Sequence, residues 1–160
     1  MARTTSTHAG SGFAASANLT DGLQRVLVDL IDLHIQDKQA HWNVIGPNFR
    51  DLHLQLDEII ESAREASDTI AERMRAVQGT PDGTVDTIAA KSSLPAFPHG
   101  EQPTGKVVDL IVERLNAAAK TIRDVEDKIE HEDPPSADLL HMIVADVEKY
   151  AWMVGAENRK

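Results

Sequence analysis

Cysteine is absent from this sequence of 160 residues. Its absence excludes a disulfide scaffold, a thiolate metal site and a cysteine nucleophile, and it fits a reducing compartment. Glycine and proline are scarce, at 9 and 7 residues, which excludes collagen-like and low-complexity chains. Apolar runs are short because Asp29, Asp32 and Glu113 interrupt them. We therefore expect no signal peptide, no membrane-spanning helix and a cytoplasmic location.

Positively charged residues are also scarce in this sequence. Lys and Arg number 16 against 26 Asp and Glu, so the net charge is −10. Nucleic-acid binding depends largely on Lys and Arg at phosphates, whereas an acidic surface concentrates cations. With 41% hydrophobic residues the chain has globular composition and one domain's length. The composition therefore favours a single globular domain whose partners include metal cations.

The hydrophobic pattern predicts an all-α fold. Residues 1–18 are small and polar, and we expect them to form a flexible N-terminal tail. The remainder, 19–158, is predicted to be one four-helix bundle domain, because apolar residues recur there with helical period. The four helices are expected over about 19–45, 49–78, 104–132 and 136–157, with Asn48 and Ser136 as candidate N-caps. The long connection 84–103 has room for a short helix near 87–91.

A polar stripe runs along the second predicted helix beside its apolar face. His53 and Asp57 lie four residues apart, as do Asp68 and Glu72, so each pair can reach one cation. His41 falls on the apolar face of the first helix and points toward neighbouring elements. Imidazole and carboxylate ligands together suit iron and zinc, and carboxylates suit manganese. The stripe is therefore a candidate metal site.

Helix geometry prevents these residues from forming one site within a chain. Asp57 and Asp68 are eleven residues apart, which is about 16 Å along a helix axis. They belong either to two half-sites or to a site between two chains, and antiparallel second helices about a two-fold axis would create two equivalent sites. An intra-chain di-iron bundle uses repeated Glu-x-x-His motifs, and the nearest match is a single Asp138-x-x-His141.

Simpler interpretations stay open at this point. A carboxylate stripe can be a solvated helix face, and Glu61 and Glu65 are interpreted so. His41 could be a core histidine, as His34 is taken to be. Asp37, four residues before His41, could orient its imidazole or could be exposed.

The stretch that carries these residues resembles the Dps family, the mini-ferritins of the ferritin-like superfamily. The match is closest over residues 38–79 and extends over about 19–158. It rests on His41-Trp42-Asn43-Val44-x-Gly46-Pro47-x-Phe49, Leu52-His53, Asp57-Glu58, Ser67-Asp68-Thr69-Ile70-Ala71-Glu72-Arg73 and Glu148-Lys149-x-x-Trp152.

The resemblance implies a ferritin-like four-helix bundle, with its short helix in the long second connection, that assembles as a hollow homo-dodecamer. It also implies an inter-subunit ferroxidase site. In that site His41, His53 and Asp57 of one chain meet Asp68 and Glu72 of its mate, and Glu72 bridges two irons. Zinc or manganese could stand in place of iron.

The implied activity is iron storage and detoxification. Fe(II) is oxidised preferably by hydrogen peroxide, otherwise by oxygen, and Fe(III) mineral is stored in the cavity, which protects against oxidative stress. Trp42 and Trp152 match tryptophans beside the site, with ordinary interface packing as the other interpretation. Asp138 matches an acidic pore position. The sequence departs from the family near Pro134-Pro135, where Glu132, Asp133 and His141 are substitute candidates.

Two alternatives belong to other classes of function. One is a metal-dependent hydrolase of amide or ester bonds at the same interface, since a bound metal polarises carbonyls and activates water. The other is a DNA-compacting structural shell. DNA binding is not expected, because it depends on tails rich in Lys and Arg in the family members that show it. Residues 1–18 contain a single residue of this kind, Arg3.

Overall fold

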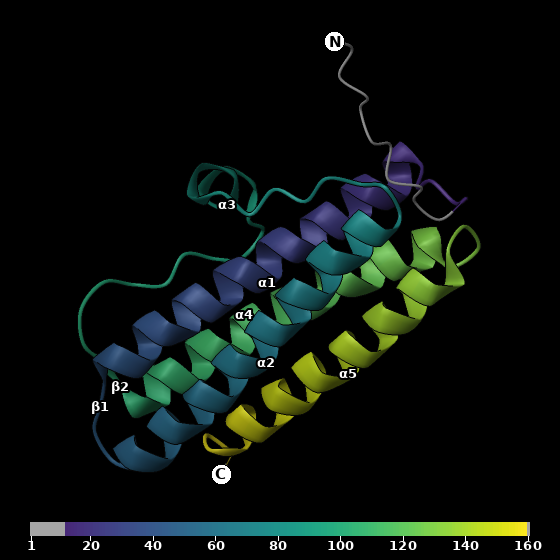
Figure 1. The fold of residues 1–160 in the computed structure, drawn as a ribbon. Helices are drawn as coiled ribbons and strands as arrows, with labels where there is room; N and C mark the ends of the chain where they lie inside the picture. The colour runs from purple at the N-terminus through teal and green to yellow at the C-terminus, as the bar shows by residue number, and fades with distance from the viewer. Residues whose placement is uncertain (1–11, 160) are drawn as a thin grey trace.

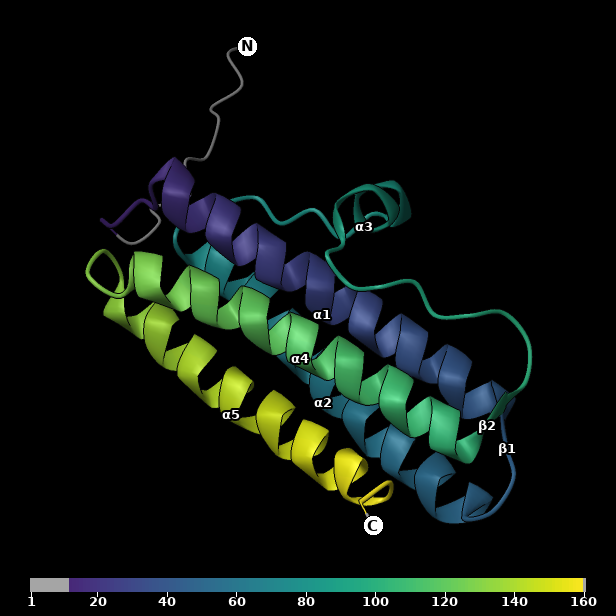
Figure 2. The same cartoon turned by 180° about the vertical axis from the view of Figure 1, so that it is seen from behind.

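The structure is a computed structural model that describes residues 12–159. Four long helices lie side by side, and a short one lies outside them against the first (Figures 1 and 2). They are α1 (Ala17–Asn43), α2 (Phe49–Ala76), α3 (Val85–Lys91), α4 (Thr104–Ile129) and α5 (Pro134–Ala156). The expected all-α bundle with a short helix in its long second connection is therefore confirmed.

The bundle is held by one continuous apolar core. Each long helix contributes the side chains of its apolar face, as the periodicity predicted. Those less than 2% exposed include Leu23, Leu30, Leu56, Ile70, Ile111 and Ile122. Within residues 12–159, no helix is both long and apolar enough to cross a membrane.

A two-residue parallel strand pair closes one end of the bundle. β1 (Val44–Ile45) follows α1 directly and pairs with β2 (Gln102–Pro103), which leads into α4. Strands this short show no alternating pattern, so the sequence did not predict them. The pairing fixes the end of the long connection beside the end of α1.

Two helix starts differ from the sequence-based prediction. α1 begins at Ala17 because the Ser16 hydroxyl accepts a hydrogen bond from the Leu19 amide at 3.2 Å. α5 begins at Pro134, so Ser136 lies inside the helix and is not its cap. Proline is tolerated in the first helical turn, because its missing N–H would have no partner there.

The residue before α1 is hydrogen-bonded to the loop between α4 and α5. The Ser16 amide and hydroxyl donate to the Glu132 carboxylate at 2.9 and 2.8 Å. Residues 1–11 of the expected tail lie outside the described residues. Within the described part of that predicted segment, Phe13, Ala15 and Ser16 are hydrogen-bonded to the bundle.

The long connection is anchored to α1 and α4 by buried polar groups. Buried Asp29 accepts hydrogen bonds from the amide and hydroxyl of Ser93 at 2.8 and 2.5 Å. The buried Arg114 guanidinium donates to the Ala96 carbonyl at 2.6 Å and to the Gln36 side chain at 2.7 Å. These bonds satisfy buried polar atoms, and they fix an irregular segment on the outside of the bundle.

A similar polar contact ties α2 to the start of α5. One terminal nitrogen of Arg73 donates to both carboxylate oxygens of Asp133 at 2.9 and 2.7 Å, and Arg73 Nε donates to Ser136 Oγ at 2.9 Å. Burial raises the pKa of Asp133, but hydrogen bonds from Ser136 and Arg73 outweigh burial and hold the pKa below its usual value. The folded state therefore favours the ionised carboxylate.

Arg73→Met should destabilise the bundle by about 3 kcal/mol at neutral pH, because Asp133 would stay buried without its positively charged partner. Urea unfolding followed by circular dichroism measures the loss. A depressed pKa contributes stability above the unfolded pKa of about 3.9, and this contribution is lost as pH falls through the folded value. The difference from wild type should therefore shrink in acid.

Arg123→Met is the matched control. Arg123 also donates twice to one carboxylate, that of Glu148, at 2.7 and 2.9 Å, but both side chains are exposed. Its removal should barely move the unfolding midpoint. Equal losses in the two variants, or a pH-independent loss for Arg73→Met, would contradict the assignment.

Candidate metal centre

The turn between α1 and α2 places two histidines face to face. His41 lies in the last turn of α1 and His53 in the second turn of α2, and the two helices pack as neighbours. Their rings stack with centroids 3.6 Å apart. Each Nδ1 lies 3.0 Å from the backbone carbonyl oxygen of the other histidine. The pair is thus fixed by two reciprocal hydrogen bonds across the helices.

These hydrogen bonds also define the proton positions. A carbonyl oxygen only accepts, so each Nδ1 carries the proton and donates it. In the neutral ring, Nε2 then holds the free lone pair, which is the form that binds a metal ion. Burial lowers the pKa of His41, which favours this neutral form. Each imidazole would therefore offer its Nε2 to a metal ion.

Asp57 completes a three-residue cluster one turn after His53. Potential ligand atoms of His41, His53 and Asp57 all lie within 4.8 Å of one another. A hydrogen bond from Lys38 holds the pKa of Asp57 below its usual value, so the carboxylate is ionised. Two imidazoles and one carboxylate with open coordination positions are typical of non-haem Fe(II) sites. The donor set therefore fits iron.

Lys38 is the residue that the sequence analysis missed. Its ammonium lies 2.7 Å from Asp57 Oδ1, where it neutralises the only carboxylate of the cluster. A lysine three residues before His41 lies on nearly the same helix face, which was the available signal. A metal cation that binds Asp57 would therefore have to displace Lys38.

Asp37 does not orient His41. Its carboxylate is fully buried, but neither oxygen has a hydrogen-bond partner among the described residues. His41 Nδ1 is instead engaged by the His53 carbonyl, with Asp57 Oδ1 at 3.3 Å. Burial raises the pKa of Asp37 well above its usual value. The expectation that Asp37 could be exposed is wrong, and so is its suggested role beside His41.

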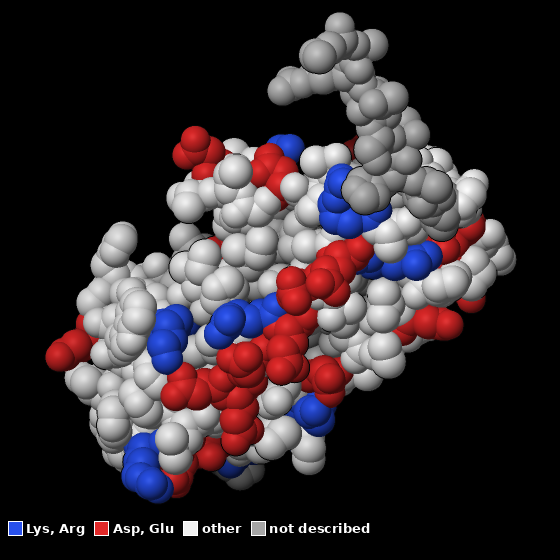
Figure 3. Space-filling model, in the orientation of Figure 1, with Lys and Arg blue, Asp and Glu red and all other residues white. Residues whose placement is uncertain are grey.

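Asp68 and Glu72 lie outside this cluster in the single chain. Both are exposed on the continuous helix α2, so Asp68 stays about 16 Å from Asp57 along the axis. Asp68 borders an open groove that it shares with His34, Glu61 and Arg64. Figure 3 shows acidic side chains gathered in a band along α2. In a single chain, His53 and Asp57 lie toward the start of α2, and Asp68 and Glu72 lie toward its end. Each end of α2 therefore carries only part of the expected set of metal ligands.

The two tryptophans expected beside the site project from the surface of the chain. Trp42 is 68% exposed directly after His41, and Trp152 is 61% exposed on α5. Indole rings this exposed are typical of interfaces between chains.

The candidate pore residues separate into two groups. Asp138 is exposed in the first turns of α5, with its Oδ1 3.8 Å from His141 Nδ1, and His141 Nε2 lies 2.5 Å from Glu126 Oε1. Asp133 is buried against Arg73, so it is not available to line a pore. The Glu132 carboxylate accepts hydrogen bonds from the amide and hydroxyl of Ser16. Asp138 and His141 are the expected pore residues that remain accessible.

The bundle and its histidine–carboxylate cluster define a ferritin-like domain. Residues 20–160 match the ferritin-like domain family. The chain is 34% identical to DNA protection during starvation protein 2 of Deinococcus radiodurans over 84% of its own length and 56% of that protein. It is 33% identical to the DNA protection during starvation protein of Agrobacterium fabrum, over 84% of this chain and 83% of that one.

A solved structure agrees with these relatives. Dps92 of Deinococcus radiodurans superposes with a TM-score of 0.85 at 33% identity, covering 87% of this chain and 84% of that one. The chain therefore belongs to the Dps family of ferritin-like proteins. It spans little more than half the length of the first Deinococcus relative.

Lys38→Gln should strengthen the binding of a redox-inert cation such as Zn²⁺ roughly tenfold, because a competing charge is removed from Asp57. Calorimetric titration of the intact protein measures the affinity. Lys120→Gln is the control, since Lys120 forms a similar exposed pair with Asp124 at 2.6 Å. Tighter binding in both variants would indicate a general charge effect, and unchanged affinity in Lys38→Gln would show that Lys38 does not compete.

Proposed function

We propose that this protein is an iron-storing and iron-detoxifying ferroxidase. The observation that carries the proposal is the stacked His41–His53 pair with Asp57, whose donor atoms suit Fe(II) and leave coordination positions open. Asp68 and Glu72 of the partner subunit would supply the missing carboxylates, since a two-fold contact between α2 helices brings one end of each acidic band to the other. Membership of the Dps family supports this arrangement.

In this proposal iron is the substrate. The two imidazoles and Asp57 bind one Fe(II), and Asp68 and Glu72 of the partner subunit bind a second beside it, with Glu72 between them. Each Fe(II) gives one electron, and hydrogen peroxide accepts both with two protons, so its O–O bond breaks to form two waters. Paired electron transfer avoids release of hydroxyl radical. Carboxylates also favour the harder Fe(III) product.

Storage would follow from assembly. Twelve chains, each with a net charge of −10, would enclose a cavity whose potential concentrates cations. Asp138 would line the access route for Fe(II), where its exposed carboxylate can exchange hydrated ions. Protection of DNA, which the names of the relatives mention, would come from removal of Fe(II) and peroxide rather than from binding to DNA.

Glu72→Ala should lower the initial rate of Fe(II) oxidation by peroxide at least about tenfold, because residues that merely support metal ligands already cost that much. Stopped-flow absorbance measures the rate, and light scattering on the same sample measures the native mass. The mass should be near twelve times 17.5 kDa. Helical content should not change, because Glu72 is exposed.

Glu58→Ala is the matched control, since Glu58 is an exposed carboxylate on the same helix. It should oxidise iron at the wild-type rate. Wild-type activity in Glu72→Ala would refute the ligand assignment, and a monomeric wild-type protein would refute the two-chain site. A dodecamer without oxidation would instead favour the structural or hydrolytic alternatives.

Asp138→Asn should slow Fe(II) uptake severalfold at low iron, since a charged access route raises cation on-rates. Oxidation at saturating iron should be preserved because the variant leaves the site intact. Asp86→Asn, which removes one exposed charge from α3, is the control. If both variants take up iron at the wild-type rate, Asp138 does not line the route.

A further inference from the structure

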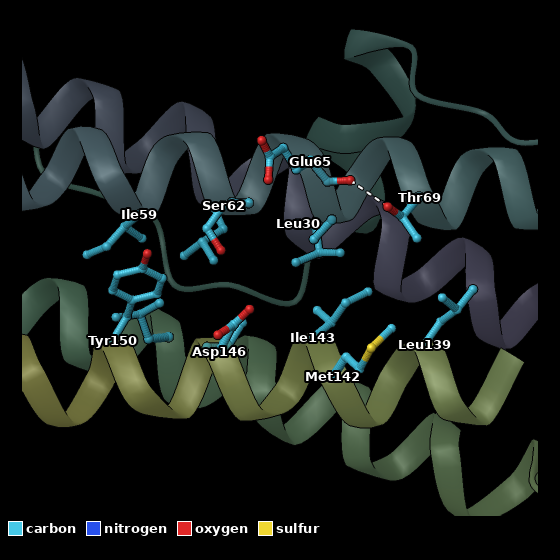
Figure 4. A pocket seen from close by; sticks show the side chains of 15 residues that line it. Leu30, Ile59, Ser62, Glu65, Thr69, Leu139, Met142, Ile143, Asp146 and Tyr150 are labelled. Carbon is cyan, nitrogen blue, oxygen red and sulfur yellow. Dashed lines mark hydrogen bonds between the residues drawn. The ribbon is translucent and has the colours of Figure 1, made fainter.

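A cavity of about 180 Å³ opens between α2 and α5 (Figure 4). Its inner wall is apolar and comes from all four long helices. The buried side chains of this wall are Leu30, Leu33, Ile59, Ala63, Leu115, Ile143 and Val147. An apolar cavity of about 150 Å³ is large enough to take up benzene. The wall therefore suits an aromatic ring or a branched alkyl group.

The mouth of this cavity is polar, and Asp146 brings a carboxylate to it. Asp146 and Tyr150 of α5 point across the opening toward α2 in Figure 4. Glu65 also borders the opening, but its carboxylate points away from α5 in Figure 4. Once Lys149 turns away, a carboxylate or phosphate group beside Asp146 would be repelled, whereas an ammonium group would be attracted. Charge thus selects among ligands that fit the apolar wall equally well.

The chain itself shows how an ammonium group is held beside this mouth. Lys149 Nζ lies 2.6 Å from Asp146 Oδ1 and 4.8 Å from the centre of the Tyr150 ring. A carboxylate together with an aromatic ring is a typical cation-binding combination. The Lys149 side chain is about half exposed, so it can turn into solvent. A ligand ammonium can then take its place.

We propose that the α2–α5 cavity binds a small hydrophobic amine. The ring or branched alkyl group fills the apolar wall, and the ammonium group replaces Lys149 at Asp146 and Tyr150. The cavity lies on a different side of α2 from the metal-binding stripe, since Ser62, Ala66 and Thr69 project roughly a third of a turn away from Asp57 and Asp68. The proposal does not depend on the ferroxidase function.

Three probes of one shape test the proposal on the full-length assembled protein: benzylamine, benzyl alcohol and benzoate. Methyl NMR of Met142 and Ile143, which line the cavity, measures binding. Benzylamine should shift both signals, benzyl alcohol should bind about fivefold more weakly, and benzoate should not bind. Equal affinities of the amine and the alcohol, or binding of benzoate, would overturn the proposed ligand class.

Two variants separate the wall from the mouth. Ala66→Leu fills the cavity and should abolish binding of benzylamine and of benzyl alcohol while the protein stays folded by circular dichroism. Asp146→Asn should lower benzylamine affinity to that of the alcohol. Asp127→Asn removes an exposed charge from α4 and should change neither affinity. Wild-type benzylamine binding in Ala66→Leu, or in Asp146→Asn, would overturn the site.

Discussion

A straight helix cannot bring its own distant residues together, and this constraint governs the proposed metal chemistry of the chain. α2 runs unbroken for 28 residues, so the rise of 1.5 Å per residue keeps Asp57 and Asp68 about 16 Å apart. The same rigidity holds His53 and Asp57 in constant register with His41 on the neighbouring helix. One chain can therefore prepare a half-site with fixed geometry but cannot complete it alone. The proposed activity thus requires self-association.

The sequence predicted the features that depend on the spacing of residues along a single helix. Apolar periodicity located the four helices, and the spacing of His53 with Asp57 located the stripe. Features that depend on contacts between helices were missed. Lys38 contacts Asp57 across the α1–α2 interface. The prediction that Ser136 caps the last helix was wrong, because the helix already begins at Pro134 with Asp133 as its N-cap. Spacing also located the candidate ligands, and the resemblance to Dps proteins supplied the prediction that they form one ferroxidase site between two chains.

Buried polar side chains that contact the long connection have hydrogen-bond partners there, whereas buried Asp37 has none among the described residues. Asp29 and Arg114 are buried, and each is satisfied by the irregular segment that follows α3. Asp37 is equally buried but unpaired among the described residues, so burial raises its pKa. An uncompensated carboxylate in a core is costly when ionised. Its presence between Gln36 and Lys38, which both have partners, marks the least satisfied point of α1.

The reciprocal bonds between His41 and His53 have a consequence for the entropy of ligand capture. Side chains that must be immobilised by an incoming ion reduce its apparent affinity, because their rotational freedom is lost at that moment. Here the freedom of both rings is lost when α1 packs against α2, since backbone carbonyls hold them. Binding should therefore require little rearrangement of the imidazoles, and local fraying of either helix end would release both rings together.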